Sequence, residues 1–386
     1  MIKKVFMWIG VFLYLSCMTS KVKFGPDRVD PSGVIPERNR TPVVLVPGYL
    51  GSELYRKEKD SEKKIYLGLS EALGLSNPDL SLHEEDSILP GKALREVSLP
   101  GGFFGVKVYS PIIERLQMEK NLDLHEFPYD WRKPNLHSGE DLILYLEKIS
   151  KNYDSKIVLI GHSNGGLLSL YATNKRPDLI SQLFLAGAPM RGGIGFLEDL
   201  MLGNSLGLNK TILEPCTVQT FGSVYAFFPV KEFDDTKNVL QTKDGKEIAD
   251  DFFSVDFWKK YNLGSYGTKL SCSPKSFPLE SYLKLSRKFK ESIQFNSSIS
   301  YPPIRNITSD KHPTARVLKG SETKDGWVWD ISNSTPSPGD GRVTIESATL
   351  PGGYLSENIP TNYTHSEILN DPSVQSEILK RINSNL

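Results

Sequence analysis

Short apolar runs alternate with helix-like apolar spacing along much of the chain. The run at residues 42–46 is rich in β-branched side chains and ends in Pro47-Gly48, which is typical of a buried parallel strand that closes in a tight turn. Alternating strands and helices predict an α/β fold, in which helices cover both faces of a mostly parallel sheet. Further strands are predicted at residues 122–127, 157–161, 182–187 and 315–318, and helices at 112–118, 141–151, 165–174 and 374–382.

Two long stretches interrupt this alternation. Residues 51–105 are irregular and too long for an ordinary connection, so they are a candidate lid. Residues 191–300 mix short helical stretches, aromatic side chains and polar turns, and we expect them to form a cap over the carboxyl edge of the sheet. The core then divides into a first part at residues 41–190 and a second part at 301–386. A chain of 386 residues, 39% of them hydrophobic, is large enough to bury such a core.

The beginning of the chain has the pattern of an export signal. Within residues 1–20, two lysines precede an apolar run that is too short to cross a bilayer, and a polar tether follows at residues 21–40. The tripeptide Leu-Ser-Cys that ends at Cys17 resembles the processing site of bacterial lipoproteins. The exported protein is therefore expected either to be anchored to a membrane through Cys17 or to be secreted after ordinary signal cleavage.

Charge and cysteine content exclude some other classes of protein. The 46 basic and 46 acidic residues balance, and no block of lysine and arginine interleaved with aromatic residues stands out, so we expect no nucleic-acid partner. The two remaining cysteines, Cys216 and Cys272, allow one disulfide bond at most and cannot form a zinc cluster by themselves.

A serine nucleophile is predicted at the end of one strand. This strand runs into Gly-His-Ser-Asn-Gly at residues 161–165, and a helical apolar pattern follows at once. A serine in such a sharp turn requires small residues two places before and after it, and its hydroxyl then points into the pocket. We assign Ser163 as the nucleophile, in preference to an ordinary glycine turn. The expected oxyanion donors are the backbone N–H of Asn164, at the helix start, and that of Tyr49, in the glycine-bearing loop after the first strand.

The acid and the base are expected after Ser163, because a triad in this type of fold follows the order serine, acid, histidine. Two histidines qualify. His312 precedes a proline in a charged loop, whereas His365 lies in a loop that can rise over the sheet edge. We choose His365 as the general base, with a solvated loop histidine as the alternative. Asp340 lies between two glycines, 25 residues before His365, and is the predicted acid; an ordinary Asp-Gly turn is the alternative.

With these residues placed, the chain resembles the lecithin:cholesterol acyltransferase family of α/β-hydrolases, which includes lysosomal phospholipase A2. The likeness rests on five segments, which are residues 42–52, Pro-Tyr-Asp-Trp-Arg at 128–132, the turn around Ser163, Gly-Ala-Pro at 187–189 with Gly192-Gly193, and Gly-Asp-Gly-Arg-Val at 339–343. The resemblance implies an α/β-hydrolase fold and transfer of a fatty acyl group from a phospholipid or glyceride. The lid candidate departs from the vertebrate pattern because it has no cysteines to close a disulfide-bound lid.

The resemblance also suggests residues that contact the substrate. Leu50 follows the predicted oxyanion donor, and Trp131 offers an apolar wall beside the pocket. Tyr225 and Phe227 belong to an aromatic segment of the cap that is similar to one in the family and that suits an acyl channel. Buried packing roles are the alternative for the three aromatic residues.

Together these residues predict acyl transfer through a covalent acyl-serine, with no metal or other cofactor. The expected partners are an ester lipid (phospholipid or glyceride), an alcohol or sterol acceptor, and a membrane surface. Phe103-Phe104 of the lid offers one contact with such a surface, although a buried entry to the next helix is the favoured interpretation of these two residues. A generic lipase or carboxylesterase with the same triad is the main alternative. A surface binding protein that keeps the fold without activity is the second.

Overall fold

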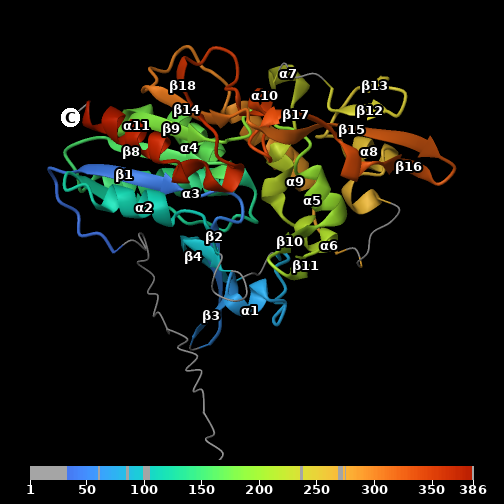
Figure 1. Ribbon diagram of the computed structural model, residues 1–386, viewed down its shortest axis with the longest axis horizontal. Coiled ribbons are helices and arrows are strands. Elements are labelled where there is room, and N and C mark those ends of the chain that lie inside the picture. Colours follow the sequence, from blue (N-terminus) through green and yellow to red (C-terminus); the bar gives the residue numbers. More distant parts are fainter. Residues whose placement is uncertain are drawn as a thin grey trace, which may run out of the picture.

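The computed structural model describes residues 33–59, 61–83, 87–98, 105–234, 238–267, 273 and 275–384. The expected export signal with Cys17, most of the tether, Cys272 and Phe103-Phe104 lie outside these ranges. Helices enclose a central sheet, and a smaller lobe extends from it (Figure 1). In the described part of the chain, no helix combines the length and the apolar character needed to cross a membrane.

The central sheet has six strands, each parallel to its neighbours. β1 and β8 are buried over their full length, which explains why their sequences are continuous apolar runs. The predicted parallel sheet is therefore confirmed. Its order is β18 (Ser356–Thr361), β14 (Ile304–Ser309), β9 (Ile180–Ala186), β8 (Ile157–His162), β1 (Thr41–Val46) and β7 (Leu122–Glu126).

Alternate residues of the central strands face two different helical layers. Val43 and Leu45 of β1 belong to one apolar cluster, with residues of α2 (Ser110–Gln117) and α11 (Pro372–Asn383). Val44 and Val46 belong to the other cluster, with residues of α3 (Asn135–Ser150), α4 (Asn164–Lys175) and α9 (Leu279–Ser292). Four of these helices match the predicted ones, although α3 begins earlier than expected.

The strand predicted at residues 315–318 forms, but it lies outside the central sheet. It is part of β15 (His312–Thr323), which pairs antiparallel with β16 (Gly326–Trp329) and β17 (Thr335–Gly339) and parallel with β12 (Leu240–Thr242). The prediction was wrong about its sheet because a short apolar run does not reveal its pairing partners. The mixed burial along β15 is typical of a strand with one face near solvent.

Two central strands were not predicted because their sequences are polar. On β14, Arg305 and Asn306 are buried and each donates a hydrogen bond: Arg305 Nη1 donates to Gln182 Oε1 at 2.7 Å, and Asn306 Nδ2 donates to the carbonyl of Ala348 at 2.9 Å. β18 is an edge strand that contains Pro360 and exposes most of its side chains. Neither strand has an apolar run like those of β1, β8 and β9.

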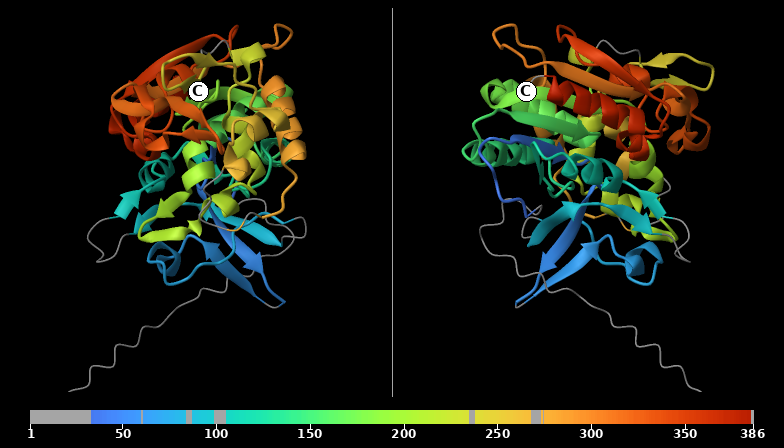
Figure 2. Two further views of the ribbon diagram at one scale, coloured as in Figure 1. Left: turned by 90° about the vertical axis from the view of Figure 1, so that its right-hand side faces the viewer. Right: turned by 60° about the vertical axis from the view of Figure 1, so that its left-hand side comes forward.

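The lid candidate folds as a small lobe. β2 (Ser52–Lys57) pairs antiparallel with both β3 (Glu62–Tyr66) and β4 (Ile88–Ala93). Figure 2 shows this lobe in blue at the foot of the molecule. The lobe meets the cap where the backbone N–H of Leu208 donates to the carbonyl of Ala72 at 2.9 Å. The lobe also contains α1 (Leu69–Ala72) and the strands β5 (Glu96–Ser98) and β6 (Gly105–Lys107), which form a hairpin.

The cap consists of short elements. Cys216 is fully buried in the cap and is disulfide-bonded. The cap elements are α5 (Leu197–Leu202), β10 (Asn204–Leu206), β11 (Asn209–Leu213), α6 (Pro215–Val218), η2 (Gly222–Phe227), α7 (Lys231–Asp234), β12, β13 (Glu247–Ile248), α8 (Val255–Lys260), η3 (Gly264–Tyr266) and α9. The remaining short helices are η1 (Pro177–Leu179), η4 (Ile331–Asn333), α10 (Ile345–Ala348) and η5 (His365–Asn370).

A polar strap, residues 79–82, connects the lid lobe to the core. Arg132 is fully buried and donates from Nη1 to the carbonyls of Leu80 and Ser81, each at 3.0 Å. Its other nitrogens pair with the carboxylate of Asp130, from Nε at 2.9 Å and from Nη2 at 2.8 Å. The buried ion pair therefore also anchors the strap.

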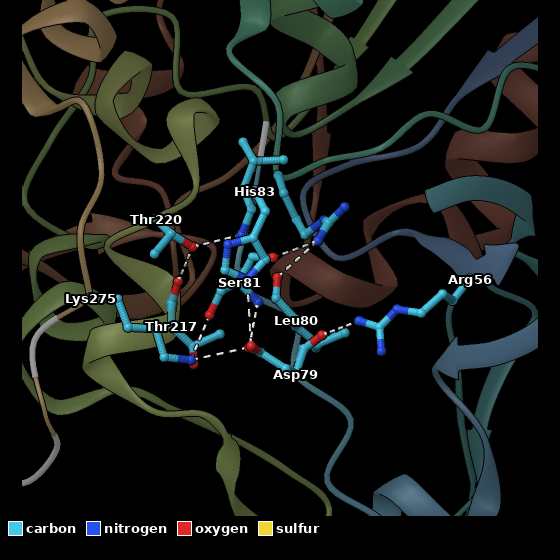
Figure 3. Close-up of polar contacts among 10 residues, drawn as sticks. Arg56, Asp79, Leu80, Ser81, His83, Thr217, Thr220 and Lys275 are labelled. Atoms are coloured by element: carbon cyan, nitrogen blue, oxygen red, sulfur yellow. Dashed lines mark hydrogen bonds and ion pairs between the residues drawn. The ribbon is translucent and has the colours of Figure 1, made fainter. Parts of the chain in front are cut away.

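The same strap binds the cap (Figure 3). Lys275 Nζ donates to Asp79 Oδ1 at 3.1 Å and to Ser81 Oγ at 2.6 Å. The backbone N–H of Leu82 donates to Thr220 Oγ1 at 2.9 Å. Lid lobe, core and cap are thus joined at one short segment.

Candidate active site

The turn between β8 and α4 holds Ser163 in a strained backbone conformation. Its φ of 53° and ψ of −122° lie in a region that non-glycine residues rarely occupy. A side-chain carbon at Gly165 would lie 2.2 Å from the carbonyl oxygen of Val46, and one at Gly161 would lie 2.6 Å from that of Gly165. The small residues expected on either side of the serine are therefore a steric requirement.

Ser163, His365 and Asp340 form a continuous line of hydrogen bonds. Ser163 Oγ lies 3.0 Å from His365 Nε2, and His365 Nδ1 lies 2.7 Å from Asp340 Oδ2. The ionised carboxylate can only accept, so Nδ1 carries the imidazole proton and Nε2 faces the serine hydroxyl as an acceptor. The fold thus brings together the three side chains assigned from the sequence, across up to 202 residues of chain.

The surroundings of Asp340 favour its ionised form. Asp340 Oδ1 accepts from the backbone N–H of Val343 at 2.7 Å and of Arg342 at 2.9 Å. Burial alone would raise the pKa of Asp340, but the charge and hydrogen bond of His365, together with these two N–H groups, lower it below its ordinary value. Gly341 has a φ of 94°, so the tight turn considered as an alternative is present as well and serves to aim the carboxylate.

The loop after β1 lies directly against the nucleophile. A side-chain carbon at Gly48 would lie 2.9 Å from Ser163 Cβ, so this close approach requires glycine. Tyr49 and Leu50 follow, and Leu50 has a left-handed φ of 60° that turns the backbone beside the serine. The predicted oxyanion loop is therefore adjacent to Ser163.

Asn164, the other predicted oxyanion residue, begins α4. Its fully buried side chain exchanges two hydrogen bonds with Asn135 of α3, at 2.6 and 3.0 Å, and donates to the hydroxyl of Tyr129 at 3.0 Å. These bonds hold the first turn of α4 in place, and with it the backbone N–H next to Ser163.

A cavity of about 440 Å³ contains the hydroxyl of the serine and the imidazole in its wall. The remaining wall has an apolar part and a polar part, which suits an amphipathic substrate. Among the described residues, no three histidine, cysteine, aspartate or glutamate side chains lie close enough together to hold a metal ion. The apolar part comprises Tyr49, Leu50 and Phe196; the polar part comprises Asn204, His312, Asp340, Arg342, Thr364 and Ser366.

Three predicted substrate contacts lie outside this cavity wall. Trp131 and Phe227 are fully buried behind Tyr49, with ring centroids 5.6 and 5.9 Å from that of Tyr49. Tyr225 lies inside the cap, where its hydroxyl donates to the carbonyl of Gln219 at 2.8 Å. We therefore assign packing roles to all three in place of substrate contact, and Trp131 and Phe227 support the loop that carries Tyr49.

Several wall residues were not anticipated from the sequence. The guanidinium of Arg342 lies 4.3 Å from the ring centroid of Phe196 and forms an ion pair with Asp199, which is buried in the cap. Arg342 belongs to the motif around Asp340, but nothing in the motif points to its partners. His312, rejected as the base, lies in the same wall, with Nε2 2.8 Å from the carbonyl oxygen of Asn362.

A parallel sheet with a strained serine at a strand-to-helix turn, and a histidine on a late loop, defines an α/β-hydrolase. A chain in the crystal structure of the Tle4-Tli4 complex has the same fold, with a TM-score of 0.53 over 89% of this chain and 98% of that one. The two sequences are 14% identical, so this likeness concerns the fold alone. The predicted fold class is confirmed.

The chain belongs to the lecithin:cholesterol acyltransferase family, which it matches over residues 104–351. It is 26% identical to human phosphatidylcholine-sterol acyltransferase over 232 residues, 47% of this chain and 51% of that protein. An uncharacterized protein of Saccharomyces cerevisiae is 27% identical over 289 residues, 72% of this chain and 43% of the relative. A triacylglycerol lipase of Burkholderia plantarii is 33% identical over 89 residues, 22% of this chain and 25% of that lipase. The chain spans about half or less of these relatives, and the resemblance to the family is confirmed.

Proposed function

We propose that this protein is a lipid acyltransferase or lipase that moves a fatty acyl group from an ester lipid to an alcohol or to water through an acyl-serine at Ser163. The observation that carries the proposal is the hydrogen-bonded line from Ser163 through His365 to Asp340, beside an amphipathic cavity. Family membership, and similarity to a sterol acyltransferase and a triacylglycerol lipase, support lipid esters as the substrate class.

The reaction proceeds in two half-reactions. His365 Nε2 takes the proton of Ser163 Oγ while this oxygen attacks the ester carbonyl, and the N–H groups of Tyr49 and Asn164 donate to the oxyanion. Asp340 stays ionised and stabilises the imidazolium. The bond to the alcohol oxygen then breaks, and His365 protonates that oxygen. In the second half-reaction His365 deprotonates water or an acceptor alcohol, which attacks the acyl-serine and releases Ser163.

The experiment that tests this proposal compares the wild-type protein with Ser163→Ala. Ser376→Ala, an exposed serine on α11, is the matched control. Each protein is incubated with phosphatidylcholine and cholesterol vesicles, and free fatty acid and sterol ester are followed by mass spectrometry. Sterol ester that depends on Ser163 indicates an acyltransferase, and fatty acid alone indicates a phospholipase.

Other donors separate the alternatives. Product from triacylglycerol or a simple ester, but not from phospholipid, would favour a generic lipase or carboxylesterase. If no donor gives product that depends on Ser163, the proposed function is wrong, and a binding protein on a hydrolase fold becomes the better description.

We also propose a membrane surface as the partner that delivers the lipid. Four leucines are 56 to 79% exposed and lie on the two insertions: Leu69 begins α1 and Leu75 follows it, while Leu202 ends α5 and Leu208 follows β10. The insertions meet at this place, and β10 begins at Asn204 in the cavity wall. Exposed apolar side chains beside the cavity suit an interfacial contact.

The leucines provide the test. Replacing Leu75 and Leu208 by serine should reduce binding to phosphatidylcholine vesicles in a flotation assay, without changing hydrolysis of a water-soluble ester. Leu144→Ser, at an exposed leucine on α3, is the control. Equal flotation of all three proteins would contradict this surface.

Export, with or without a lipid anchor at Cys17, is a further proposal. It is supported by the basic and apolar pattern of residues 1–20. Detergent partitioning and intact mass of wild type and Cys17→Ala distinguish the two routes. A lipid mass that disappears in the variant indicates an anchor, and an unmodified mature chain indicates secretion.

A further inference from the structure

Two buried side chains beside the proposed catalytic residues have no role in the mechanism above. Tyr109 and His162 are 2% and 5% exposed. The backbone N–H of Gly48 donates to the hydroxyl oxygen of Tyr109 at 2.8 Å. This hydroxyl lies 2.7 Å from His162 Nδ1, and His162 Nε2 lies 2.9 Å from the carbonyl oxygen of His365. The contacts form one unbroken chain of hydrogen bonds.

The chemistry of these groups sets the direction of each bond. A carbonyl can only accept, so His162 Nε2 carries the ring proton and donates to His365. Nδ1 of a neutral imidazole is then an acceptor, so the hydroxyl of Tyr109 donates to it and its oxygen accepts from Gly48. Burial, reinforced by the charge of His365, lowers the pKa of His162 to about 3. The ring therefore stays neutral when His365 becomes charged.

We propose that Tyr109 and His162 are positioning residues for acyl transfer, which hold the oxyanion loop, the nucleophile turn and the loop of the base at fixed mutual distances. The hydrogen-bonded chain begins one residue before the proposed oxyanion donor, passes through the residue before the nucleophile, and ends on the backbone of the base. These three segments must not move relative to one another during the reaction. The inference rests on the proposed function.

Loss of the Tyr109 hydroxyl has a defined effect on this chain. The N–H of Gly48 loses its acceptor, and His162 becomes able to move its proton to Nδ1. The lone pair of Nε2 would then face the carbonyl oxygen of His365 and repel it. Because a displacement of about 1 Å can cost roughly 100-fold in rate, the loss should appear in kcat. The cavity wall is unchanged, so KM should stay nearly constant.

The molecule contains a matched control. His125 and Tyr153 form a second buried pair, in which His125 Nε2 lies 2.6 Å from the hydroxyl of Tyr153. This hydroxyl donates to Asp123 at 2.9 Å, and neither residue of the pair lines the cavity. Tyr153→Phe therefore removes a buried tyrosine–histidine contact without touching the proposed network.

The experiment measures kcat, KM and Tm with a water-soluble short-chain ester. Tyr109→Phe and His162→Ala should lower kcat roughly 10- to 100-fold with KM within about twofold, whereas Tyr153→Phe should lower Tm and leave kcat unchanged. His162→Gln keeps an amide nitrogen that reaches the carbonyl of His365, so it should retain most of kcat. His162→Asn, whose side chain is one carbon shorter than that of glutamine, should lose most of kcat.

Other results would contradict the positioning role or the proposed function. The positioning role is wrong if Tyr109→Phe keeps wild-type kcat, or if His162→Gln is as impaired as His162→Ala. It is also wrong if Tyr153→Phe, at a similar loss of Tm, loses as much kcat as Tyr109→Phe. Nitrogen-15 NMR should show His162 protonated at Nε2 in the wild type and a mixture of tautomers in Tyr109→Phe. A wild-type protein whose Ser163 neither hydrolyses esters nor reacts with a fluorophosphonate refutes the proposed function, and the positioning role with it. A fluorophosphonate reaction that is fast and independent of Tyr109 refutes the positioning role alone.

Discussion

The sheet edge around Ser163 and the lid lobe opposite are held by different kinds of contact. At the sheet edge, glycines bring backbones into direct contact, and buried hydrogen bonds fix the side chains of His365 and Asp340. The lid lobe is held by the polar strap, with the buried Arg132 on one side and the partly exposed Lys275 on the other. The contacts around Ser163 are therefore buried, whereas the lid lobe depends partly on contacts that solvent can replace.

The largest expected effect lies at the sheet edge. Asp340→Asn should lower kcat on the order of 10⁴-fold, because the imidazole loses the acceptor that orients it. A short water-soluble ester isolates this effect from lipid binding. Asp310→Asn, at an exposed aspartate after β14, should leave kcat unchanged. An Asp340→Asn variant within tenfold of wild type would remove this residue from the proposed triad.

Lowering the pH should reduce the stability of the folded protein through His162, which lies at the same sheet edge. Its pKa falls from 6.5 to about 3 in the folded protein, so between these pH values the unfolded chain binds a proton that the folded protein does not. Stability therefore decreases as pH falls through this window, by on the order of 3 to 5 kcal/mol. Urea unfolding at pH 7 and pH 4 measures the loss.

The histidine variants sharpen this prediction. His162→Gln should flatten the pH dependence, and His83→Gln, at an exposed histidine, should leave it unchanged. An equally steep dependence in His162→Gln would show that other groups control the acid transition.

Among the contacts of the strap, the buried ion pair of Arg132 and Asp130 should have the largest effect on the free energy of unfolding. Arg132→Met leaves the carboxylate of Asp130 buried without its cation and two strap carbonyls without their donor, which should cost about 3 to 5 kcal/mol in free energy of unfolding. Adding Asp130→Asn should recover part of the loss. A cost below about 1 kcal/mol would contradict a structural role for the pair.

The smallest effect is expected from the exposed side of the strap. Lys275→Gln should cost at most about 1 kcal/mol, because solvent screens its contact with Asp79. Burial would raise the pKa of Asp79, but the N–H and hydroxyl of Ser81 and the ammonium of Lys275 outweigh it and lower the pKa. The contact therefore contributes fully above the ordinary aspartate pKa, and its contribution is lost as the pH falls from that value through the lowered pKa of the folded protein.

Limited proteolysis of the lid lobe at pH 7, where Asp79 is ionised, measures this contact. Cleavage should be faster in Lys275→Gln than in the wild type, with kcat on a soluble ester unchanged. Lys284→Gln, at an exposed lysine on α9, is the control. Identical cleavage of both variants would mean that Lys275 does not restrain the lobe.

The two regions also differ in how far the sequence could predict them. β1, β8 and β9 contain apolar runs, and the glycine-flanked Ser163 and Asp340 have local signatures that steric requirements impose. β14 and β18 were not predicted, because buried polar residues and a proline in an edge strand form no such pattern. Cap residues in the cavity wall, such as Phe196, reach it only through tertiary packing, and Arg342 meets Asp199 across 143 residues. The catalytic roles themselves stay predictions until turnover is measured.

The order of the site along the chain governs when it is completed during synthesis. Ser163 precedes His365 by 202 residues, and Asp340 precedes His365 by 25. Chains emerge from the ribosome from the N-terminus and begin to fold as they do so. The nucleophile turn is therefore exposed early, while β14, β18 and the proposed acid and base arrive late. A nascent chain therefore carries Ser163 without the two side chains proposed to activate it, until His365 has been added 202 residues later.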